Sequence, residues 1–188
     1  MRLFLVRHPP PLIAPGICYG STDLAVAPAE LTRVLAALRG TLPSGAPLFS
    51  SPLLRCAGLA AALAASLDAA APTIDARLAE LDFGDWEMRH WDAIARTDID
   101  AWAADMAHYR PGGGESVFLM AARVRAWHAH LLRHAQAHAI EHAIVVCHAG
   151  TMRLLSACHA GLSLPDMALH AARTPHKIGY GATIVLDG

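Results

Sequence analysis

Two short, continuous apolar runs restrict the fold of this chain more than any other feature of its sequence. Residues 3–6 read Leu-Phe-Leu-Val, and residues 143–147 read Ala-Ile-Val-Val-Cys. Continuous apolar runs of this length are typical of strands that are buried on both faces, as in a parallel sheet covered by helices. Each run leads into a histidine, because Arg7-His8 ends the first and His148 follows the second.

Helical patterns separate these strands along the chain. The sequence predicts helices over residues 28–40, 53–67, 116–137 and 151–160, and further short strands over residues 47–51 and 182–186. Strands that alternate with helices favour the α/β class, here a three-layer α/β/α sandwich around a mostly parallel sheet.

One domain is expected to span residues 1–188, because a chain of this length can bury one well-sized core. Residues 85–115 include three tryptophans and many polar residues. We therefore expect this stretch to form a less regular, cap-like insertion near the functional site.

Charge and composition exclude several classes of protein. A net charge of −1 gives no reason to expect a nucleic acid or an anionic membrane surface as partner, and no apolar run is long enough to cross a bilayer. The four cysteines have no disulfide-framework or CxxC spacing, and the chain reaches Arg7 too soon for a signal peptide. A cytoplasmic location is the expectation, and the sequence is compatible with a homodimer.

The polar residues that follow the predicted strands point to an anion site. Open α/β sheets bind ligands outside the carboxyl ends of their strands, where His8 and His148 can face one another. After a third strand, Arg55 falls in the first turn of a helix. The dipole and free N–H groups at that helix start would also favour an anion.

Four motifs follow one another in a fixed order along the chain. They are Arg7-His8, Ser-Pro-Leu-Leu-Arg at 51–55, Leu-Ala-Glu at 78–80 with Gly-Asp-Trp-Glu at 84–87, and His-Ala-Gly at 148–150. Together they resemble the histidine phosphatase superfamily, the phosphoglycerate mutase-like group, over nearly the whole chain. The resemblance implies the following roles: a phosphorylated nucleophile at His8, phosphate-binding groups at Arg7, Arg55 and His148, and a proton donor at Glu80.

These residues predict phosphoryl transfer without a metal or another cofactor. Phosphoryl transfer mainly needs positioning and positive charge around the equatorial oxygens, which two guanidinium groups and His148 can supply. Neutral His8 would attack phosphorus and form a phosphohistidine, which water then hydrolyses. Glu80 would protonate the leaving alkoxide and then activate the water.

A narrower likeness concerns the substrate, expected to be a small phosphorylated metabolite. Residues 18–23 and 83–89 are similar to motifs of alpha-ribazole phosphatases, which act in assembling the nucleotide loop of cobalamin. The likeness implies alpha-ribazole 5′-phosphate as substrate, and we assign Tyr19, Gly20 and Glu115 to substrate binding. A broad-specificity sugar-phosphate phosphatase and a non-catalytic phospholigand-binding module stay open as alternatives.

Two features of the sequence depart from this interpretation. The family usually has glycine after the Arg-His pair, whereas this chain has Pro9, which has no backbone N–H to offer a phosphate. Residues 147–153 spell C-x5-R, the phosphate loop of cysteine-dependent phosphatases, which makes Cys147 a rival nucleophile. Glu87 and Asp82 are alternatives to Glu80 as proton donor.

Four histidines spaced by four residues also suggest a metal site. They are His130, His134, His138 and His142, and those within the predicted helix share one face. No acidic residue or cysteine is interleaved with them in the pattern of a metal site. We therefore interpret them as part of a solvated helix face.

Overall fold

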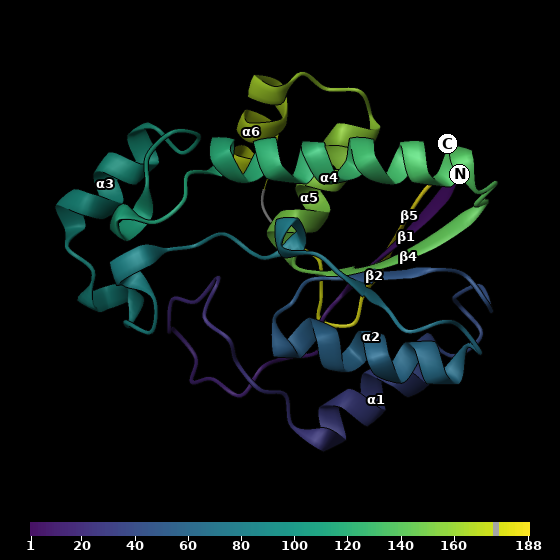
Figure 1. Ribbon diagram of the computed structural model, residues 1–188. Coiled ribbons are helices and arrows are strands. Elements are labelled where there is room, and N and C mark those ends of the chain that lie inside the picture. The colour runs from purple at the N-terminus through teal and green to yellow at the C-terminus, as the bar shows by residue number, and fades with distance from the viewer. Residues whose placement is uncertain (175–176) are drawn as a thin grey trace.

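The computed structural model describes residues 1–174 and 177–188, and within them a sheet of five strands lies between two layers of helices (Figure 1). The strand order is β3-β2-β4-β1-β5. The strands are β1 (Arg2–Arg7), β2 (Leu48–Ser50), β3 (Thr73–Ile74), β4 (His142–Cys147) and β5 (Thr183–Leu186). The first four are parallel and β5 pairs antiparallel with β1, which confirms the predicted α/β/α sandwich with a mostly parallel sheet.

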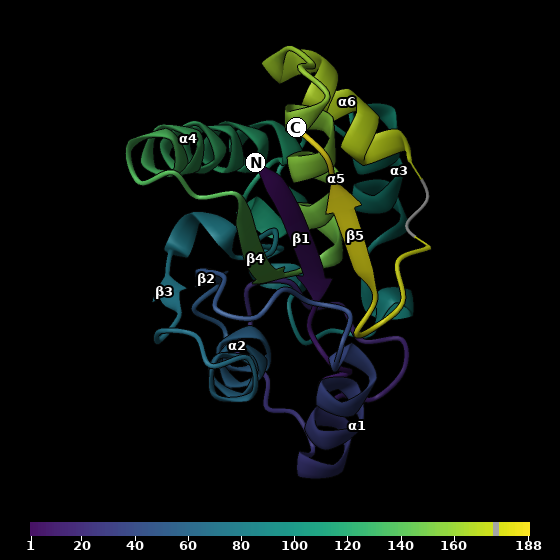
Figure 2. The same cartoon turned by 90° about the vertical axis from the view of Figure 1, so that its right-hand side faces the viewer.

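Helices cover both faces of this sheet. One layer consists of α1 (Pro28–Leu38) and α2 (Leu54–Ser66), and the other of α4 (Val117–Ala137), α5 (Ala149–His159) and α6 (Leu164–Arg173) (Figures 1 and 2).

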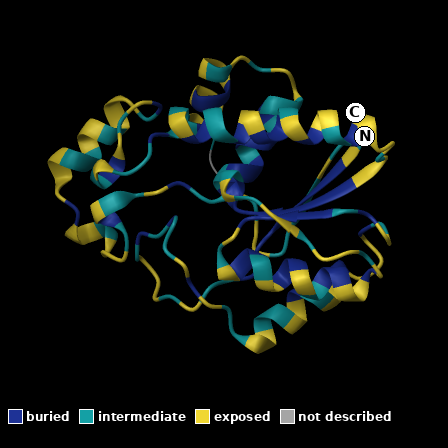
Figure 3. Ribbon diagram, in the orientation of Figure 1, coloured by how far each residue is buried: buried dark blue, intermediate teal, exposed yellow. Residues whose placement is uncertain are grey.

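The central strands explain the continuous apolar runs of the sequence. In β1, Leu3 and Leu5 enter the core beneath α4 and α5, whereas Phe4 and Val6 enter the core beneath α1 and α2. Side chains alternate between the two faces of a strand, so a strand covered on both faces needs apolar residues at every position. Figure 3 shows these strands buried along most of their length.

The order and register of the strands bring three segments together at one edge of the sheet. β4 lies between β1 and β2, with Arg7 opposite Cys147 and Ser50 opposite Val146. The chain segments that follow these three strands therefore start side by side. They carry His8, Ser51 and His148.

The insertion lies beyond this edge of the sheet (Figure 1). It contains the 3₁₀ turns η2 (Gly84–Trp86), η3 (Trp91–Ala93) and η4 (Pro111–Gly113) and the helix α3 (Arg96–Ala104). It shares a small hydrophobic cluster with the loop between β1 and α1, built on the buried residues Cys18, Trp86 and Ile94 with mostly aromatic side chains around them. That the chain forms one domain with a cap-like insertion stays a proposal.

Two α-helices and one strand were missing from the sequence prediction. The helices α3 and α6 and the two-residue strand β3 were not expected. α6 does have a recognisable sequence pattern. Ser163 caps the start of the helix by accepting from the Asp166 N–H, and the residues that face the core are Met167, Ala168 and Ala171. β3 is too short to show a period. Among the described residues, no helix is both long and apolar enough to span a bilayer.

Candidate active site

A cavity of about 520 Å³ opens at the carboxyl ends of β1 and β4. One end of this cavity is polar, and it brings together five side chains predicted from the sequence. They are Arg7, His8, Arg55, Glu80 and His148. We call this part the phosphate end of the cavity.

His8 lies at the floor of the phosphate end and is only 2% exposed. Its Nδ1 lies 2.6 Å from the carbonyl oxygen of Pro9, which can only accept a hydrogen bond. Nδ1 therefore carries the proton and the lone pair is on Nε2. Burial, followed by the charges of Arg55 and Arg7, lowers the pKa of His8 to about 3. The ring is thus neutral and nucleophilic at neutral pH.

His148 faces His8 across the site. The two ring centroids lie 5.0 Å apart in an edge-to-face arrangement. The Nε2 atom of His148 lies 2.8 Å from the hydroxyl oxygen of Ser51, which fixes the ring. Burial is the main cause that holds the pKa of His148 well below its ordinary value, and the neighbouring His8 and Arg55 act in the same direction.

Arg55 is the more buried of the two arginines, at 1% exposed. Its Nη1 donates to the carbonyl oxygen of Thr22 at 2.7 Å and its Nη2 to that of Gly20 at 2.5 Å. Each terminal nitrogen keeps a second N–H, because a guanidinium has five donors. The helix start at α2 is less open than expected, because the N–H of Leu54 donates to the carboxylate of Asp23 at 2.7 Å.

Arg7 is held from the C-terminal segment. Its Nη1 donates to the carbonyl oxygen of Ile178, and its Cζ lies 4.0 Å from the centroid of the Tyr180 ring. Among the described residues, the Nε atoms of Arg7 and Arg55 are buried without a hydrogen-bond partner. Buried donors are rarely left unpaired, so these two favour an anionic ligand in the cavity.

Glu80 approaches the phosphate end from the loop after η1 (Ala76–Leu78). Its Oε2 accepts from the backbone N–H of Gly150 at 3.0 Å, and its Oε1 from the N–H of Leu81 at 3.1 Å. Two backbone donors fix the plane of the carboxyl group. The remaining lone pairs of its oxygens can carry a proton.

Glu87 has a different role from Glu80. Its carboxylate accepts from the N–H groups of Ser21 at 2.8 Å, Thr22 at 2.7 Å and Phe83 at 3.0 Å. Burial favours the neutral acid, but the hydrogen bonds, first that of the Thr22 hydroxyl, outweigh it and lower the pKa of Glu87. Glu87 therefore anchors the loop whose carbonyl groups hold Arg55. Asp82, the other alternative, is exposed and accepts from the N–H of Gly84.

The three residues assigned to substrate binding lie in different places. Tyr19 lines the cavity. Gly20 contributes its carbonyl group to Arg55, and a Cβ at this position would lie 1.9 Å from the oxygen of Leu81. Glu115 forms an ion pair with Arg123 at 2.7 Å and does not line this cavity. A contact between Glu115 and substrate stays a prediction.

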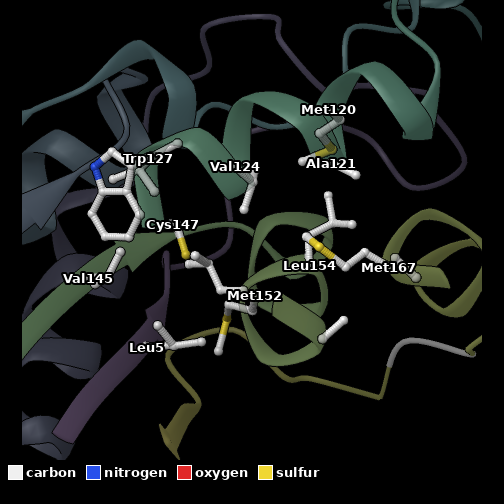
Figure 4. Close-up of a cluster of buried hydrophobic side chains, with 14 of the residues drawn as sticks. Leu5, Met120, Ala121, Val124, Trp127, Val145, Cys147, Met152, Leu154 and Met167 are labelled. Carbon is white, nitrogen blue, oxygen red and sulfur yellow. The ribbon is translucent and has the colours of Figure 1, made fainter. Parts of the chain in front are cut away.

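Cys147 does not reach the cavity. Its side chain is fully buried in the core beneath α4 and α5, close to Val145 and Met152 (Figure 4). Burial raises the pKa of this thiol well above its ordinary value. A thiol that stays protonated in an apolar core is a poor nucleophile. The geometry therefore disfavours the cysteine-phosphatase interpretation.

Sequence reasoning missed three residues of the site. Ser51 contacts His148, Tyr180 contacts Arg7, and Arg153 lines the cavity while donating to the carbonyl groups of Ala171 and Thr174. Ser51 stood within a recognised motif. Tyr180 had no signal, because it lies in an irregular segment that only the tertiary fold brings to the site.

The spaced histidines lie on the outer surface of α4 and at the start of β4. His130, His138 and His142 are exposed, and the rings of His134 and His138 lie 4.2 Å apart. Within residues 1–174 and 177–188, no three His, Cys, Asp or Glu side chains are placed to hold a metal ion.

Known proteins resemble this chain in sequence and in fold. The chain is 34% identical over 93 residues to an adenosylcobalamin/alpha-ribazole phosphatase of Escherichia coli (strain K12); this alignment covers 48% of the chain and 44% of that relative. The chain thus spans less than half of that relative's length.

Two solved structures match this chain over nearly its whole length and over most of their own. An alpha-ribazole phosphatase from Shigella flexneri has a TM-score of 0.80 and 25% identity, with 100% of this chain and 90% of that chain covered. A mycobacterial glucosyl-3-phosphoglycerate phosphatase in complex with VO3 has a TM-score of 0.80 and 26% identity, with 99% and 92% covered.

The sequence profile of one family extends over most of the chain. Residues 3–176 match the Histidine phosphatase superfamily (branch 1). This match confirms the predicted family of phosphatases, and the relatives confirm the likeness to alpha-ribazole phosphatases. The chain belongs to the histidine phosphatase superfamily.

Proposed function

We propose that this chain is a metal-independent phosphomonoesterase that acts through a phosphohistidine on His8. The observation that carries the proposal is the pairing of two neutral imidazoles, His8 and His148, with ring centroids 5.0 Å apart in a cavity lined by Arg7 and Arg55. Two guanidinium groups can balance the charge of a phosphoryl group without a metal ion.

The first step forms a bond between nitrogen and phosphorus. The Nε2 lone pair of His8 attacks phosphorus in line with the ester oxygen, and the P–O ester bond breaks. Glu80 gives its proton to the leaving alkoxide, so an alcohol departs and a carboxylate stays. Arg7, Arg55 and His148 donate to the equatorial oxygens as charge builds on them.

The second step returns the enzyme to its starting state. Water attacks phosphorus while the Glu80 carboxylate takes its proton, and the N–P bond to His8 breaks. Inorganic phosphate then leaves. The role of Glu80 in both steps is supported by its two backbone hydrogen bonds, which keep the carboxyl group oriented.

Hydrolysis of p-nitrophenyl phosphate in EDTA tests the reaction. We expect turnover in EDTA by the wild-type chain, none by His8→Ala, and slow turnover with retained phosphate binding by Glu80→Gln. A wild-type chain that binds phosphate but never hydrolyses the ester would instead be a non-catalytic phospholigand-binding module.

The substrate that we propose is alpha-ribazole 5′-phosphate, in the assembly of the cobalamin nucleotide loop. Beyond the phosphate end the cavity wall is largely apolar, and it includes Phe83, Trp91, Trp102, Met106 and Val117. An aromatic base can pack against such a wall, whereas the hydroxyl groups of a sugar would find few partners there. The relatives named alpha-ribazole phosphatase add support.

A broad-specificity sugar-phosphate phosphatase is the second candidate, favoured by the similarity to glucosyl-3-phosphoglycerate phosphatase. We expect kcat/KM for alpha-ribazole 5′-phosphate to exceed that for glucose 6-phosphate. Trp102→Ala should lower the first value about three- to tenfold and leave the second within about twofold. Equal values for both substrates in the wild-type chain would favour the second candidate. A homodimer and a cytoplasmic location stay predictions.

A further inference from the structure

Two tyrosines from distant parts of the chain meet at the phosphate end of the cavity. Tyr19 lies in the loop between β1 and α1, and Tyr180 lies between α6 and β5. Their hydroxyl oxygens are 2.7 Å apart, so one phenol donates to the other. Burial and this hydrogen bond raise the pKa of Tyr19 above its ordinary value, so its phenol keeps its proton.

Each of these tyrosines faces one of the phosphate-binding arginines. The Tyr180 ring centroid lies 4.0 Å from Cζ of Arg7, and the Tyr19 ring centroid lies 5.5 Å from Cζ of Arg55. Both distances are within the range of a cation–π interaction. The Tyr180 ring also lies 5.5 Å from the ring of His8.

The backbone around Tyr180 is attached to the strand that carries Arg7. The N–H of Arg7 donates to the carbonyl oxygen of Ala182 at 2.9 Å, and the N–H of Gly181 donates back to that of Arg7 at 3.1 Å. Arg7 also donates through Nη1 to Ile178. These contacts place the Tyr180 ring at a fixed position relative to the guanidinium.

Packing into the core does not account for this tyrosine. Tyr180 is 39% exposed, and among the described residues its ring lies against Arg7 and His8. Among residues 1–174 and 177–188, Arg7 donates to the protein only through Nη1, which leaves Nε and Nη2 for a ligand. Because the Tyr180 ring packs against the planar guanidinium, it fixes the direction in which these remaining N–H donors point.

We propose that Tyr180 is a positioning residue, whose ring holds the Arg7 guanidinium in the orientation that binds the phosphoryl oxygens, while the hydroxyl of Tyr19 holds the ring. This inference rests on the proposed function, since it concerns the same site. A guanidinium that is already oriented loses less side-chain freedom when phosphate binds. Loss of the ring should therefore weaken phosphate binding.

Titration with inorganic phosphate tests the proposal without turnover. By calorimetry, Tyr180→Leu should raise the Kd of phosphate about fivefold to tenfold, whereas Tyr180→Phe, which keeps the ring, should stay within about threefold. Tyr180→Met provides a second ring-free variant should the leucine variant not fold. A wild-type Kd in a folded ring-free variant would overturn the proposal.

Kinetics separate positioning from a purely structural role. We expect Tyr180→Leu to raise KM by the same factor as Kd and to change kcat less than about threefold. A structural role would instead lower the melting temperature and the fraction of active molecules, with KM unchanged, which would contradict the proposal. If the wild-type chain binds phosphate but lacks turnover, the proposed function fails and the Kd series still decides this inference.

Two double substitutions test the contact of Tyr180 with Arg7 and the hydrogen bond between Tyr19 and Tyr180. In an Arg7→Lys background, Tyr180→Leu should no longer change the Kd of phosphate, because an ammonium has no plane to orient. Tyr19→Phe and Tyr180→Phe remove the same hydrogen bond. The double variant should therefore bind phosphate no more weakly than the single variant with the higher Kd. If the changes in the free energy of phosphate binding were fully additive in both double-mutant cycles, the proposal would be overturned.

Discussion

The backbone N–H of Gly150 donates to Oε2 of Glu80 at 3.0 Å, and a Cβ on Gly150 would lie 2.3 Å from the other carboxyl oxygen. The start of α5 and the loop after η1, which are distant in the sequence, therefore fix together the orientation of the carboxyl group proposed as proton donor. Only a residue without a side chain fits at position 150 while Glu80 keeps this place.

Gly150→Ala should therefore displace Glu80 without removing it. Since general acid catalysis contributes about 10²–10⁴-fold, we expect kcat to fall at least about tenfold with the Kd of phosphate nearly unchanged. Gly58→Ala is the matched control, because Gly58 lies in α2 and a Cβ there would meet no atom within 4 Å. Wild-type kcat in Gly150→Ala would contradict the role given to Glu80.

Ser51 should matter because it holds His148. The hydroxyl lies 2.8 Å from Nε2 in a fully buried setting, so Ser51→Ala leaves a buried ring nitrogen without this partner. We expect a loss of about 1–3 kcal/mol in the free energy of unfolding and a lower kcat. Ser50→Ala serves as control, since its hydroxyl donates to the carbonyl oxygen of Ser51 instead. Equal kcat values in the two variants would speak against this role of Ser51.

Stability should depend on the buried histidines at acidic pH. His8, with a pKa lowered to about 3, and His148 bind fewer protons in the folded chain than in the unfolded chain below about pH 6.5. The free energy of unfolding should therefore fall as the pH is lowered, by up to about 1.4 kcal/mol per pH unit and histidine.

Urea unfolding between about pH 7 and pH 5 measures this slope. His8→Gln should make the dependence shallower, whereas His138→Gln, at an exposed position, should leave it unchanged. An unchanged slope in His8→Gln would mean that His8 is not buried in its neutral form.

Glu87 should affect the site through the loop that it anchors. The N–H of Ser21 donates to one oxygen of Glu87 and the N–H of Thr22 to the other, so the NH₂ group of Glu87→Gln faces one of these two donors in place of an acceptor. We expect a loss of about 1–3 kcal/mol in stability and a higher KM, because the Thr22 carbonyl that holds Arg55 shifts. Differential scanning calorimetry and steady-state kinetics measure both effects. A loss of kcat alone, at wild-type stability and KM, would indicate that Glu87 is the proton donor.

The two histidines of the site could be predicted because each directly follows a buried strand. The apolar runs identified β1 and β4, and parallel strands that are neighbours in the sheet bring His8 and His148 together. The order of neighbours was not encoded in any local pattern, so the pairing of β4 between β1 and β2 needed the structure.

The missed features arise from tertiary contacts. The ring of Tyr180 reaches Arg7 only because β5 returns antiparallel along β1. The capping of α2 by Asp23 joins residues 31 positions apart, and no periodicity reports such a contact. Pro9 was noted for its missing N–H, whereas its carbonyl group is what fixes the tautomer of His8.

Trapping of the phosphorylated chain tests the central claim most directly. The wild-type chain is mixed with substrate, quenched within one turnover at alkaline pH, digested and mapped by mass spectrometry. We predict one HPO₃ group on the peptide that contains His8, and none in His8→Ala. A phosphoryl group on Cys147, or hydrolysis without any trapped phosphoenzyme, would contradict it.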